Sequence, residues 1–286
     1  MPVRLIGALE NVRGPVADAA ASLWGLPPGS ARWWRSSACH VFASGAGYLR
    51  LVPAEVRSAS SFAAIAKLMA DLAGRGLRVV APLPSVDGRL TETVETPLGE
   101  MHAMLLAAAP GEQIDVDDLT PDLVRSWGAA LAHLHDASPG RDLERDLGLF
   151  GELSELDDRE LAEDLLGRLA RVPRDDIGLV HGDFELDNLA WSGGNPTAFD
   201  FDDAAVSWRA ADVAIAVRDL GDRDAFIAGY RTVRPLDVRH LGLFARAQAA
   251  SSMVRAQQAL VDAGDALPGL QDKLRQHIDR QRVIAS

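Results

Sequence analysis

Cysteine is almost absent from this sequence of 286 residues, which contains one, Cys39. A single cysteine forms neither a disulfide framework nor a cysteine-based zinc site. No apolar stretch approaches the roughly 18 residues that indicate a membrane-spanning helix. The first thirty residues lack the basic, apolar and small-residue order of a secretion signal. We therefore expect a cytoplasmic protein without a membrane partner.

Lysine is also scarce, and the charge balance is acidic. The chain has two lysines, Lys67 and Lys273, and a formal net charge of −12. This balance argues against nucleic acid as a partner, because phosphate backbones are bound by basic surfaces. Residues 1–110 carry 8 acidic and 10 basic side chains, whereas residues 111–286 carry 33 and 19. The acidic second part either attracts a cationic small molecule or simply solvates helix faces.

The first part of the chain has the pattern of a small antiparallel sheet with few helices. Apolar residues recur every three or four positions over residues 58–74, which predicts a helix, and another is expected over residues 8–24. The turn 44–47 separates two short β-type runs. The expected strands cover residues 39–42, 48–52, 79–80, 89–94 and 101–106.

Beyond a predicted hinge at residues 109–111, the chain becomes mostly helical. Thr120 and Pro121 have the character of a cap and first turn for a helix that follows them. Short strands interrupt the helical region at residues 177–180, 189–191 and 198–201. The sequence thus predicts an α+β protein with two lobes. The first covers residues 1–108, including a helical extension over residues 1–30, and the second, mainly helical, covers residues 109–286.

The most informative stretch is residues 181–188, which read HGDFELDN after a predicted buried strand. Phosphoryl transfer needs a carboxylate that accepts the hydroxyl proton and oxygen ligands that hold a divalent metal. Asp183 follows a glycine that permits a sharp turn, and it suits the first task. Asn188, five residues later, offers an amide oxygen suited to Mg²⁺. His181 is expected to position the loop through backbone hydrogen bonds rather than to accept a proton.

A second acidic signal follows at residues 199–203, which read FDFDD, and Asp200 lies twelve residues after Asn188. A hairpin over residues 189–201 is predicted to return Asp200 to the side of Asn188, where both would bind the metal. The chain contains only three asparagines, so a chance match to the spacing His-Gly-Asp-x4-Asn is improbable. The pair Asp200 and Asp202 also resembles the nucleophile and acid of haloacid dehalogenase phosphatases. That motif normally opens its fold, however, and here it comes late in the chain.

Together these residues resemble the aminoglycoside phosphotransferase family, small-molecule kinases that share the protein-kinase-like fold. The family's catalytic loop reads His-Gly-Asp-x4-Asn, and its metal-binding strand ends in an aspartate after apolar residues. Further resembling segments are LAHLH at residues 131–135, ADVA at 211–214 and FIAGYR at 226–231. The resemblance implies a bilobal fold with Asp183 as catalytic base and Asn188 and Asp200 as Mg²⁺ ligands. It also implies ATP or GTP as co-substrate, and Asp212 as a buried support for the catalytic loop.

The nucleotide lobe departs from the usual pattern of kinases with this fold, which hold the α- and β-phosphates with a strand lysine paired to a helix glutamate. Neither lysine lies in a predicted strand, and no glutamate occurs between residues 57 and 72. Arg50 occupies the expected strand position, and its guanidinium suits bidentate phosphate binding. The alternative is a surface arginine. The missing pair also leaves open a pseudokinase that binds nucleotide without turnover.

The resemblance implies phosphate transfer from ATP or GTP to a hydroxyl of a small molecule. An amine-bearing acceptor such as an aminoglycoside-like antibiotic, and hence a role in antibiotic resistance, suits the acidic second lobe. Glu185 and Asp187 are candidates to bind an ammonium group, with plain solvent exposure as the alternative. A protein Ser/Thr kinase of the same fold is a second possibility. The oligomeric state is not readable from the sequence.

Overall fold

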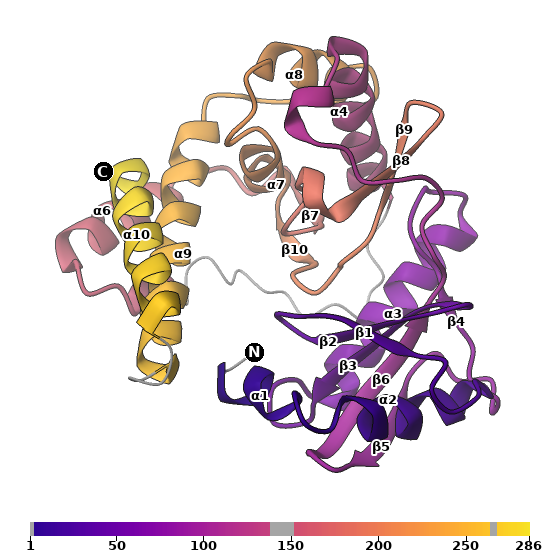
Figure 1. Ribbon diagram of the computed structural model, residues 1–286. Helices are drawn as coiled ribbons and strands as arrows, with labels where there is room; N and C mark the ends of the chain where they lie inside the picture. Colours follow the sequence, from indigo (N-terminus) through magenta and orange to yellow (C-terminus); the bar gives the residue numbers. More distant parts are fainter. Residues whose placement is uncertain (1–2, 138–151, 264–267) are drawn as a thin grey trace. The chain divides into compact units, whose positions relative to one another are not determined.

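The computed structural model describes residues 3–137, 152–263 and 268–286 (Figure 1). The chain divides into two compact units, residues 1–109 and residues 110–286. The predicted α+β class is confirmed, because the first unit is built around an antiparallel sheet and the second is mainly helical. Among the described residues, no helix combines the length and apolarity that crossing a membrane requires.

The first unit contains a six-stranded antiparallel sheet in the order β1–β2–β3–β6–β4, with β5 also paired to β6. The predicted turn at residues 44–47 joins β2 to β3, and Gly47 has a φ of 140° there. A Cβ on Gly47 would lie 2.0 Å from the carbonyl oxygen of Leu106, so the approach of the two strands requires glycine. The strands are β1 (Arg32–Ser36), β2 (His40–Ser44), β3 (Gly47–Pro53), β4 (Pro82–Leu83), β5 (Glu92–Thr96) and β6 (Gly99–Leu106).

Two of these strands differ from the sequence prediction. β1 was not expected, because its residues RWWRS are mostly exposed and show no alternation between apolar and polar side chains. The strand expected at residues 79–80 lies slightly later, at β4, where it pairs with the end of β6. Both strands, β1 and β4, are at the ends of the strand order, where a strand has fewer neighbours and its sequence need not show a buried pattern.

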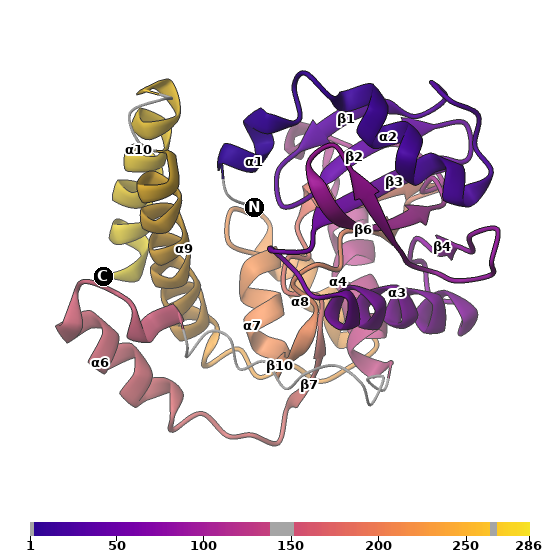
Figure 2. The same ribbon diagram turned by 90° about the horizontal axis from the view of Figure 1, so that it is seen from below.

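Helices lie on both faces of this sheet (Figure 2). On one face α2 (Arg13–Ala21) shares a hydrophobic core with Leu49 and Leu51 of β3. On the other face α3 (Ala59–Gly74) packs against β4 and β6, as its predicted apolar spacing requires. The helix expected over residues 8–24 is interrupted, because α1 (Val3–Ala8) ends before α2 begins. Pro15 explains the break, since it fits only the first turn of a helix.

The second unit is built from six described helices and two short two-stranded sheets. α4 and α8 cross closely where a Cβ on Gly128 would lie 2.1 Å from the carbonyl oxygen of Phe226, and one on Gly229 would lie 2.0 Å from that of Arg125. Thr120 caps α4 with Pro121 in its first turn, as predicted. The helices are α4 (Pro121–Asp136), α6 (Arg159–Leu169), α7 (Arg209–Ala216), α8 (Arg223–Arg231), α9 (Leu241–Ala263) and α10 (Pro268–Ala285).

Each short sheet has two antiparallel strands. β8 (Leu189–Ser192) pairs with β9 (Asn195–Ala198), and β7 (Ile177–Val180) pairs with β10 (Ala205–Trp208). The strand predicted over residues 198–201 is therefore wrong in its bounds, because pairing ends at Ala198 and the chain turns before Asp200. β10 was not predicted. Its partner lies 25 or more residues earlier in the chain, and no local turn links the two strands.

Candidate active site

The loop after β7 turns sharply at Gly182. This glycine has a φ of +84°, and a Cβ there would lie 2.2 Å from the carbonyl oxygen of Asp203. Only glycine allows both the left-handed backbone and the close approach of the second chain segment. The turn places Asp183 immediately after the buried end of β7, and it brings residues 181–183 beside the loop that carries Asp200.

Asp183 is partly buried and is held by Asn188. The side-chain nitrogen of Asn188 donates to the carbonyl oxygen of Asp183 at 2.9 Å and to its carboxylate Oδ2 at 2.8 Å. Both contacted atoms are acceptors, so the amide nitrogen must face Asp183 and the amide oxygen is directed away from it. Burial raises the pKa of the Asp183 carboxyl, the charge of Asp200 adds to this, and the bond from Asn188 opposes it.

Asp200 has a φ of 64° and is the only non-glycine residue with a positive φ in the part of the chain that the structure describes. The residue before it, Phe199, is bonded at both ends: its N–H donates to the carbonyl oxygen of Asn188 at 3.0 Å, and its carbonyl oxygen accepts from His181. These bonds join the loop of residues 181–188 to the segment carrying Asp200. A strained backbone at such a position is typical of functional sites.

These side chains suit a hard divalent cation. Asp200 offers a carboxylate and Asn188 an amide oxygen, and the charge of Asp200 adds to the effect of burial in raising the pKa of Asp183. Within the described ranges no three His, Cys, Asp or Glu side chains form a closed metal cage. An open site with few protein oxygens is what Mg²⁺ uses when substrate phosphates and water complete its shell.

Behind the loop, the buried carboxylate of Asp212 on α7 accepts three hydrogen bonds. Its Oδ2 accepts from the backbone N–H of His181 at 2.6 Å and from Nε2 of His135 at 3.0 Å, and its Oδ1 accepts from the N–H of Gly182 at 3.0 Å. Burial opposes ionisation of Asp212, but the hydrogen bonds from His135 and from the backbone of His181 hold its pKa below the ordinary value. Asp212 therefore fixes the backbone immediately before Asp183.

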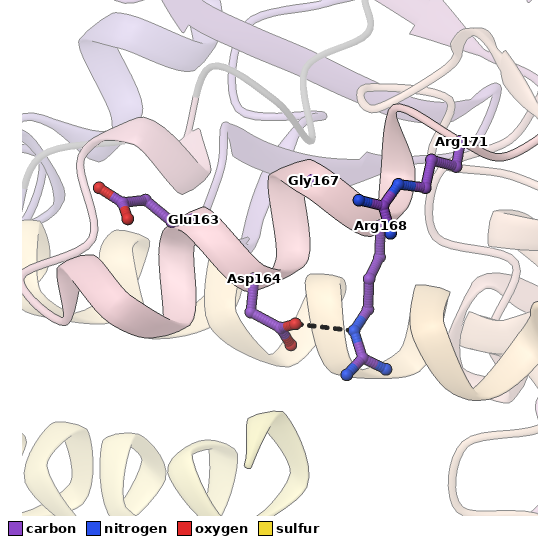
Figure 3. Close-up of a pocket in the computed structure, with 5 residues that line it drawn as sticks. All are labelled: Glu163, Asp164, Gly167, Arg168 and Arg171. Carbon is purple, nitrogen blue, oxygen red and sulfur yellow. Dashed lines mark hydrogen bonds and ion pairs between the residues drawn. The ribbon is translucent and has the colours of Figure 1, made fainter.

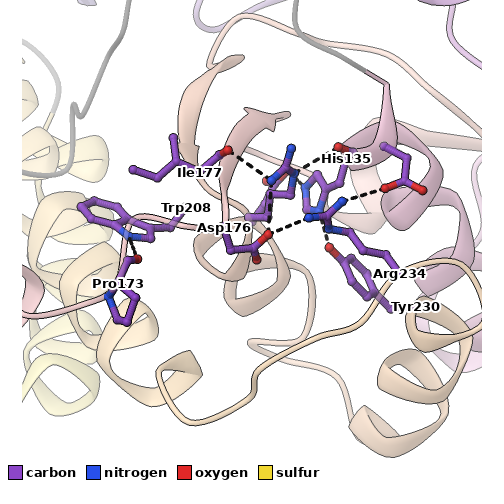
Figure 4. A network of polar contacts seen from close by, with 10 residues as sticks. His135, Pro173, Asp176, Ile177, Trp208, Tyr230 and Arg234 are labelled. Atoms are coloured by element: carbon purple, nitrogen blue, oxygen red, sulfur yellow. Dashed lines mark hydrogen bonds and ion pairs between the residues drawn. The ribbon is translucent and has the colours of Figure 1, made fainter.

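The support extends from Asp212 through His135 to Tyr230, and Figure 4 shows His135 beside Tyr230. Because a carboxylate only accepts, Nε2 of His135 donates to Asp212, and Nδ1 of the neutral ring accepts from the hydroxyl of Tyr230 at 2.7 Å. Both rings are fully buried. Burial raises the pKa of Tyr230, which keeps its proton available for this bond.

A second layer of charged groups surrounds this network. Asp176 accepts from Nη2 of Arg234 at 2.9 Å (Figure 4). It also accepts from Nη1 of Arg209 at 3.2 Å, and Nε of Arg209 donates to the carbonyl oxygen of His135 at 3.0 Å. Arg234 also donates to Asp136 at the end of α4 at 2.7 Å. The strand β7, the helix α4 and the helix α8 are thus tied together around the support of the catalytic loop.

His181 is buried between Phe184 and Phe201, with ring centroids 5.4 and 4.4 Å away. Its Nε2 donates to the carbonyl oxygen of Phe199 at 3.1 Å, and its Nδ1 accepts from the N–H of Asp183 at 3.3 Å. Burial lowers the pKa of His181, although nearby Asp212 and Asp200 oppose this. Both ring nitrogens are occupied by backbone groups, which agrees with a positioning role.

The two acidic residues considered for substrate binding have different surroundings. Glu185 forms an ion pair with Arg218, whose Nη2 lies 2.5 Å from Oε1. Asp187 is exposed, and its carbonyl oxygen accepts from the side chain of Gln113 at 2.5 Å. Arg218, His135 and Tyr230 were not singled out as site residues. His135 and Tyr230 lie in segments that resembled the family, whereas Arg218 stands in no motif.

In the first unit, Arg50 is not a surface arginine. It is 4% exposed, and its Nε and Nη2 lie 3.3 and 3.2 Å from Sγ of Cys39. Its neighbours Leu49 and Leu51 belong to the core with α2, so alternation along β3 directs Arg50 to the face of α3. Lys67, on α3 itself, is exposed.

A hollow elsewhere in the second unit contains none of the predicted site residues. It is lined by Glu163, Asp164, Gly167, Arg168 and Arg171 of α6 and the turn after it (Figure 3). Its main contact is the exposed pair of Arg168 and Asp164 at 2.8 Å, one helical turn apart. Exposed ion pairs of this kind contribute little to stability.

Comparison with known proteins places this geometry in context. Residues 41–239 match the model of a family described as "phosphotransferase enzyme family". An amicoumacin kinase of Bacillus subtilis (strain 168) is 30% identical over 168 residues, covering 52% of this chain and 49% of that protein. The chain therefore spans about half the length of this relative.

Two solved structures share the fold over nearly their whole length. One is an amicoumacin kinase in complex with AMP-PNP, Ca²⁺ and Ami, with a TM-score of 0.76, 19% identity, and coverage of 98% of this chain and 96% of that one. The other is a microcompartment-associated aminopropanol kinase, with a TM-score of 0.73, 22% identity, and coverage of 94% and 95%. At these identities the likeness confirms the predicted kinase-like fold.

Proposed function

Since this chain belongs to the phosphotransferase enzyme family, we propose that it transfers the γ-phosphoryl group of ATP or GTP to a hydroxyl group of a small molecule. The observation that supports this most is the arrangement of Asp183, whose carboxylate is held by Asn188 at 2.8 Å and influenced by the charge of Asp200. One base and two oxygen donors at one turn are the groups that phosphoryl transfer requires.

In this proposal Asp183 accepts the proton of the acceptor hydroxyl. The hydroxyl oxygen forms a bond to the γ-phosphorus, the bond from that phosphorus to the bridging oxygen of the β-phosphate breaks, and the nucleoside diphosphate leaves. The hydrogen bond from Asn188 aims the Asp183 carboxylate, and Asp212 holds the backbone before it. A fixed base of this kind contributes through position more than through strength.

Asn188 and Asp200 would hold Mg²⁺, which neutralises negative charge on the transferring phosphoryl group when bound. The first unit would supply the nucleotide lobe, with Arg50 in place of the usual strand lysine. Its guanidinium contacts Sγ of Cys39, and the planar shape of this group suits bidentate binding of phosphate. ATP as the nucleotide is supported by the AMP-PNP named with a solved relative of the same fold.

The proposed acceptor carries an amine as well as a hydroxyl. The excess of acidic residues after residue 110 favours a cationic group, and a solved structure of the same fold is named for aminopropanol, which has both groups. The amicoumacin kinase supports an antibiotic acceptor, and with it a role in resistance. The expected cytoplasmic location stays a prediction.

The test is a coupled assay of nucleoside diphosphate release with ATP or GTP, Mg²⁺ and a panel of hydroxyl compounds that includes aminoglycosides and amino alcohols. We expect acceptor-dependent release with at least one compound, and mass spectrometry of a product heavier by one phosphate. No transfer to any member, with nucleotide bound, would favour the pseudokinase that the absent lysine–glutamate pair suggests. Incubation with proteins and labelled ATP separates the protein kinase alternative.

A further inference from the structure

The ion pair of Glu185 and Arg218 lies beside the proposed base. Glu185 is two residues after Asp183 in the catalytic loop, and Arg218 follows α7. Nη2 of Arg218 bonds to Glu185 at 2.5 Å, and Nε bonds to Asp219 at 3.2 Å. The third nitrogen, Nη1, makes no hydrogen bond to any residue that the structure describes. Among the described residues, the ion pair therefore leaves part of the hydrogen-bonding capacity of Arg218 unused.

The pair is neither buried nor fully exposed. The Arg218 side chain is 26% exposed and that of Glu185 is 32% exposed. Burial raises the pKa of Glu185 even though the charge of Arg218 opposes this, so the attraction does not fully offset the loss of water around the carboxylate. An ion pair of this kind exchanges its partners at little cost, provided that each charge keeps an opposite charge nearby.

The charge of Arg218 affects the pKa values of two other groups, Asp183 and His277. It opposes the effect of burial on the pKa of Asp183, and it helps to lower the pKa of His277 on α10, where burial and Arg280 contribute more. Arg255 of α9 acts on His277 as well. Arg218, Arg255 and Arg280 therefore all lie near His277, although this part of the chain is acidic overall.

We propose that Glu185 and Arg218 together recognise a zwitterionic acceptor, with Glu185 binding its ammonium group and Arg218 its carboxylate. The inference rests on the proposed function and defines its substrate class further. A neutral pair of opposite charges complements a ligand head group that is also neutral overall, and neither protein charge is left without a partner after the exchange. Among the compounds that fit are short hydroxy amino acids.

A carboxylate suits this position better than a phosphate. Arg218 supplies one positive charge and is already shared with Glu185 and Asp219. A dianionic group here would also face the negative charge of Asp183 and of the transferring phosphoryl group. A carboxylate brings a single charge and matches the planar edge of a guanidinium.

The spacing along the loop limits the size of the acceptor. Two residues of fully extended chain span at most about 7 Å. The segment from Asp183 to Glu185 is shorter than this, because the N–H of Glu185 donates to the carbonyl oxygen of Asp183 at 2.8 Å. The reacting hydroxyl at Asp183 and the head group at Glu185 are therefore separated by only a few bonds.

The test uses matched compounds that differ only by a carboxylate: L-serine and ethanolamine, L-threonine and 1-aminopropan-2-ol, L-homoserine and 3-aminopropan-1-ol. Calorimetric titration of the full chain with Mg²⁺ and AMP-PNP measures the binding of each compound. We expect at least one carboxylate compound to bind at least about tenfold more tightly than its partner. R218Q should abolish this preference, and E185Q should weaken both members of the pair.

R239Q is the matched control, because Arg239 is 78% exposed and pairs only with Asp237 among the described residues. It removes the same charge and should leave the preference intact. If a melting curve shows that R218Q does not fold, R218K replaces it. Lysine keeps the positive charge but lacks the planar guanidinium, so R218K should reduce the preference for the carboxylate compound. Equal binding within every pair by the wild type, or an undiminished preference in R218Q and R218K, overturns the inference.

The two proposals fail in different ways. Phosphate transfer to hydroxyl compounds without any carboxylate preference contradicts the zwitterion inference and leaves the kinase proposal standing. A carboxylate preference in binding that depends on Arg218, without phosphate transfer from ATP or GTP, supports head-group recognition and contradicts the proposed reaction.

Discussion

Replacing Tyr230 with phenylalanine removes one oxygen atom from the network behind the catalytic loop and leaves the ring packing unchanged. The lost hydroxyl donates to Nδ1 of His135 at 2.7 Å, and both residues are fully buried. The histidine nitrogen would then be a buried acceptor without a partner, which costs about 1–3 kcal/mol. For a domain of this size, each kcal/mol lowers the melting temperature by roughly 2–4 °C.

We therefore expect Tyr230→Phe to lower the melting temperature of the second unit by roughly 2–12 °C in calorimetric scans. Tyr48→Phe is the matched control, since Tyr48 is the other tyrosine of the chain and its hydroxyl makes no hydrogen bond to a described residue. It should melt like the wild type. An unchanged melting temperature for Tyr230→Phe, or an equal loss in the control, would refute this account of the network.

Three further changes test other parts of the structure. Gly229→Ala should destabilise by about 1–3 kcal/mol in urea unfolding, because its Cβ would meet the backbone of α4, whereas Gly167→Ala on the open face of α6 should stabilise by about 0.5–1 kcal/mol. Asp212→Asn should destabilise the protein most above about pH 5, because folding lowers the pKa of Asp212. The difference from wild type in the free energy of unfolding should shrink as the pH falls further. A difference that stays constant with pH would contradict a role for the charge of Asp212. Asn188→Leu should weaken Mg²⁺-dependent nucleotide binding about tenfold or more in calorimetry, and unaltered Mg²⁺ dependence would exclude Asn188 as a ligand.

The arrangement of the catalytic loop was accessible from the sequence, because it depends on local features. Gly182 marks the turn, five residues separate Asp183 from Asn188, and a short hairpin returns Asp200 to their side. Each feature spans few residues, so motif and turn chemistry were sufficient to expect their proximity. The roles assigned to these side chains stay predictions.

The partners of these residues were not accessible, because they come from distant parts of the chain. His135 and Tyr230 are 95 residues apart in sequence, and Glu185 and Arg218 are 33 apart. An isolated arginine after a helix carries no signal until tertiary packing places it beside a carboxylate. The same holds for β10, whose pairing with β7 depends on a connection of more than twenty residues.

Arg50 shows a third kind of limit. Its strand and register were predictable from the β-type run, but its burial was not, because a charged residue in a strand usually faces water. On this strand the guanidinium contacts Sγ of Cys39. The cysteine was considered only as a small buried side chain, and it contacts the arginine that is predicted to replace the usual lysine.

The most direct test of the central claim is the rate of phosphate transfer by Asp183→Asn, measured with a substrate of the wild type at saturating ATP and Mg²⁺. Asparagine keeps the shape of the side chain and a contact with Asn188 but cannot accept the hydroxyl proton. We expect kcat to fall by about 10²–10⁴-fold, with the Kd for AMP-PNP and Mg²⁺ within about threefold of wild type. A kcat within about tenfold of wild type would contradict the assignment of Asp183 as the base.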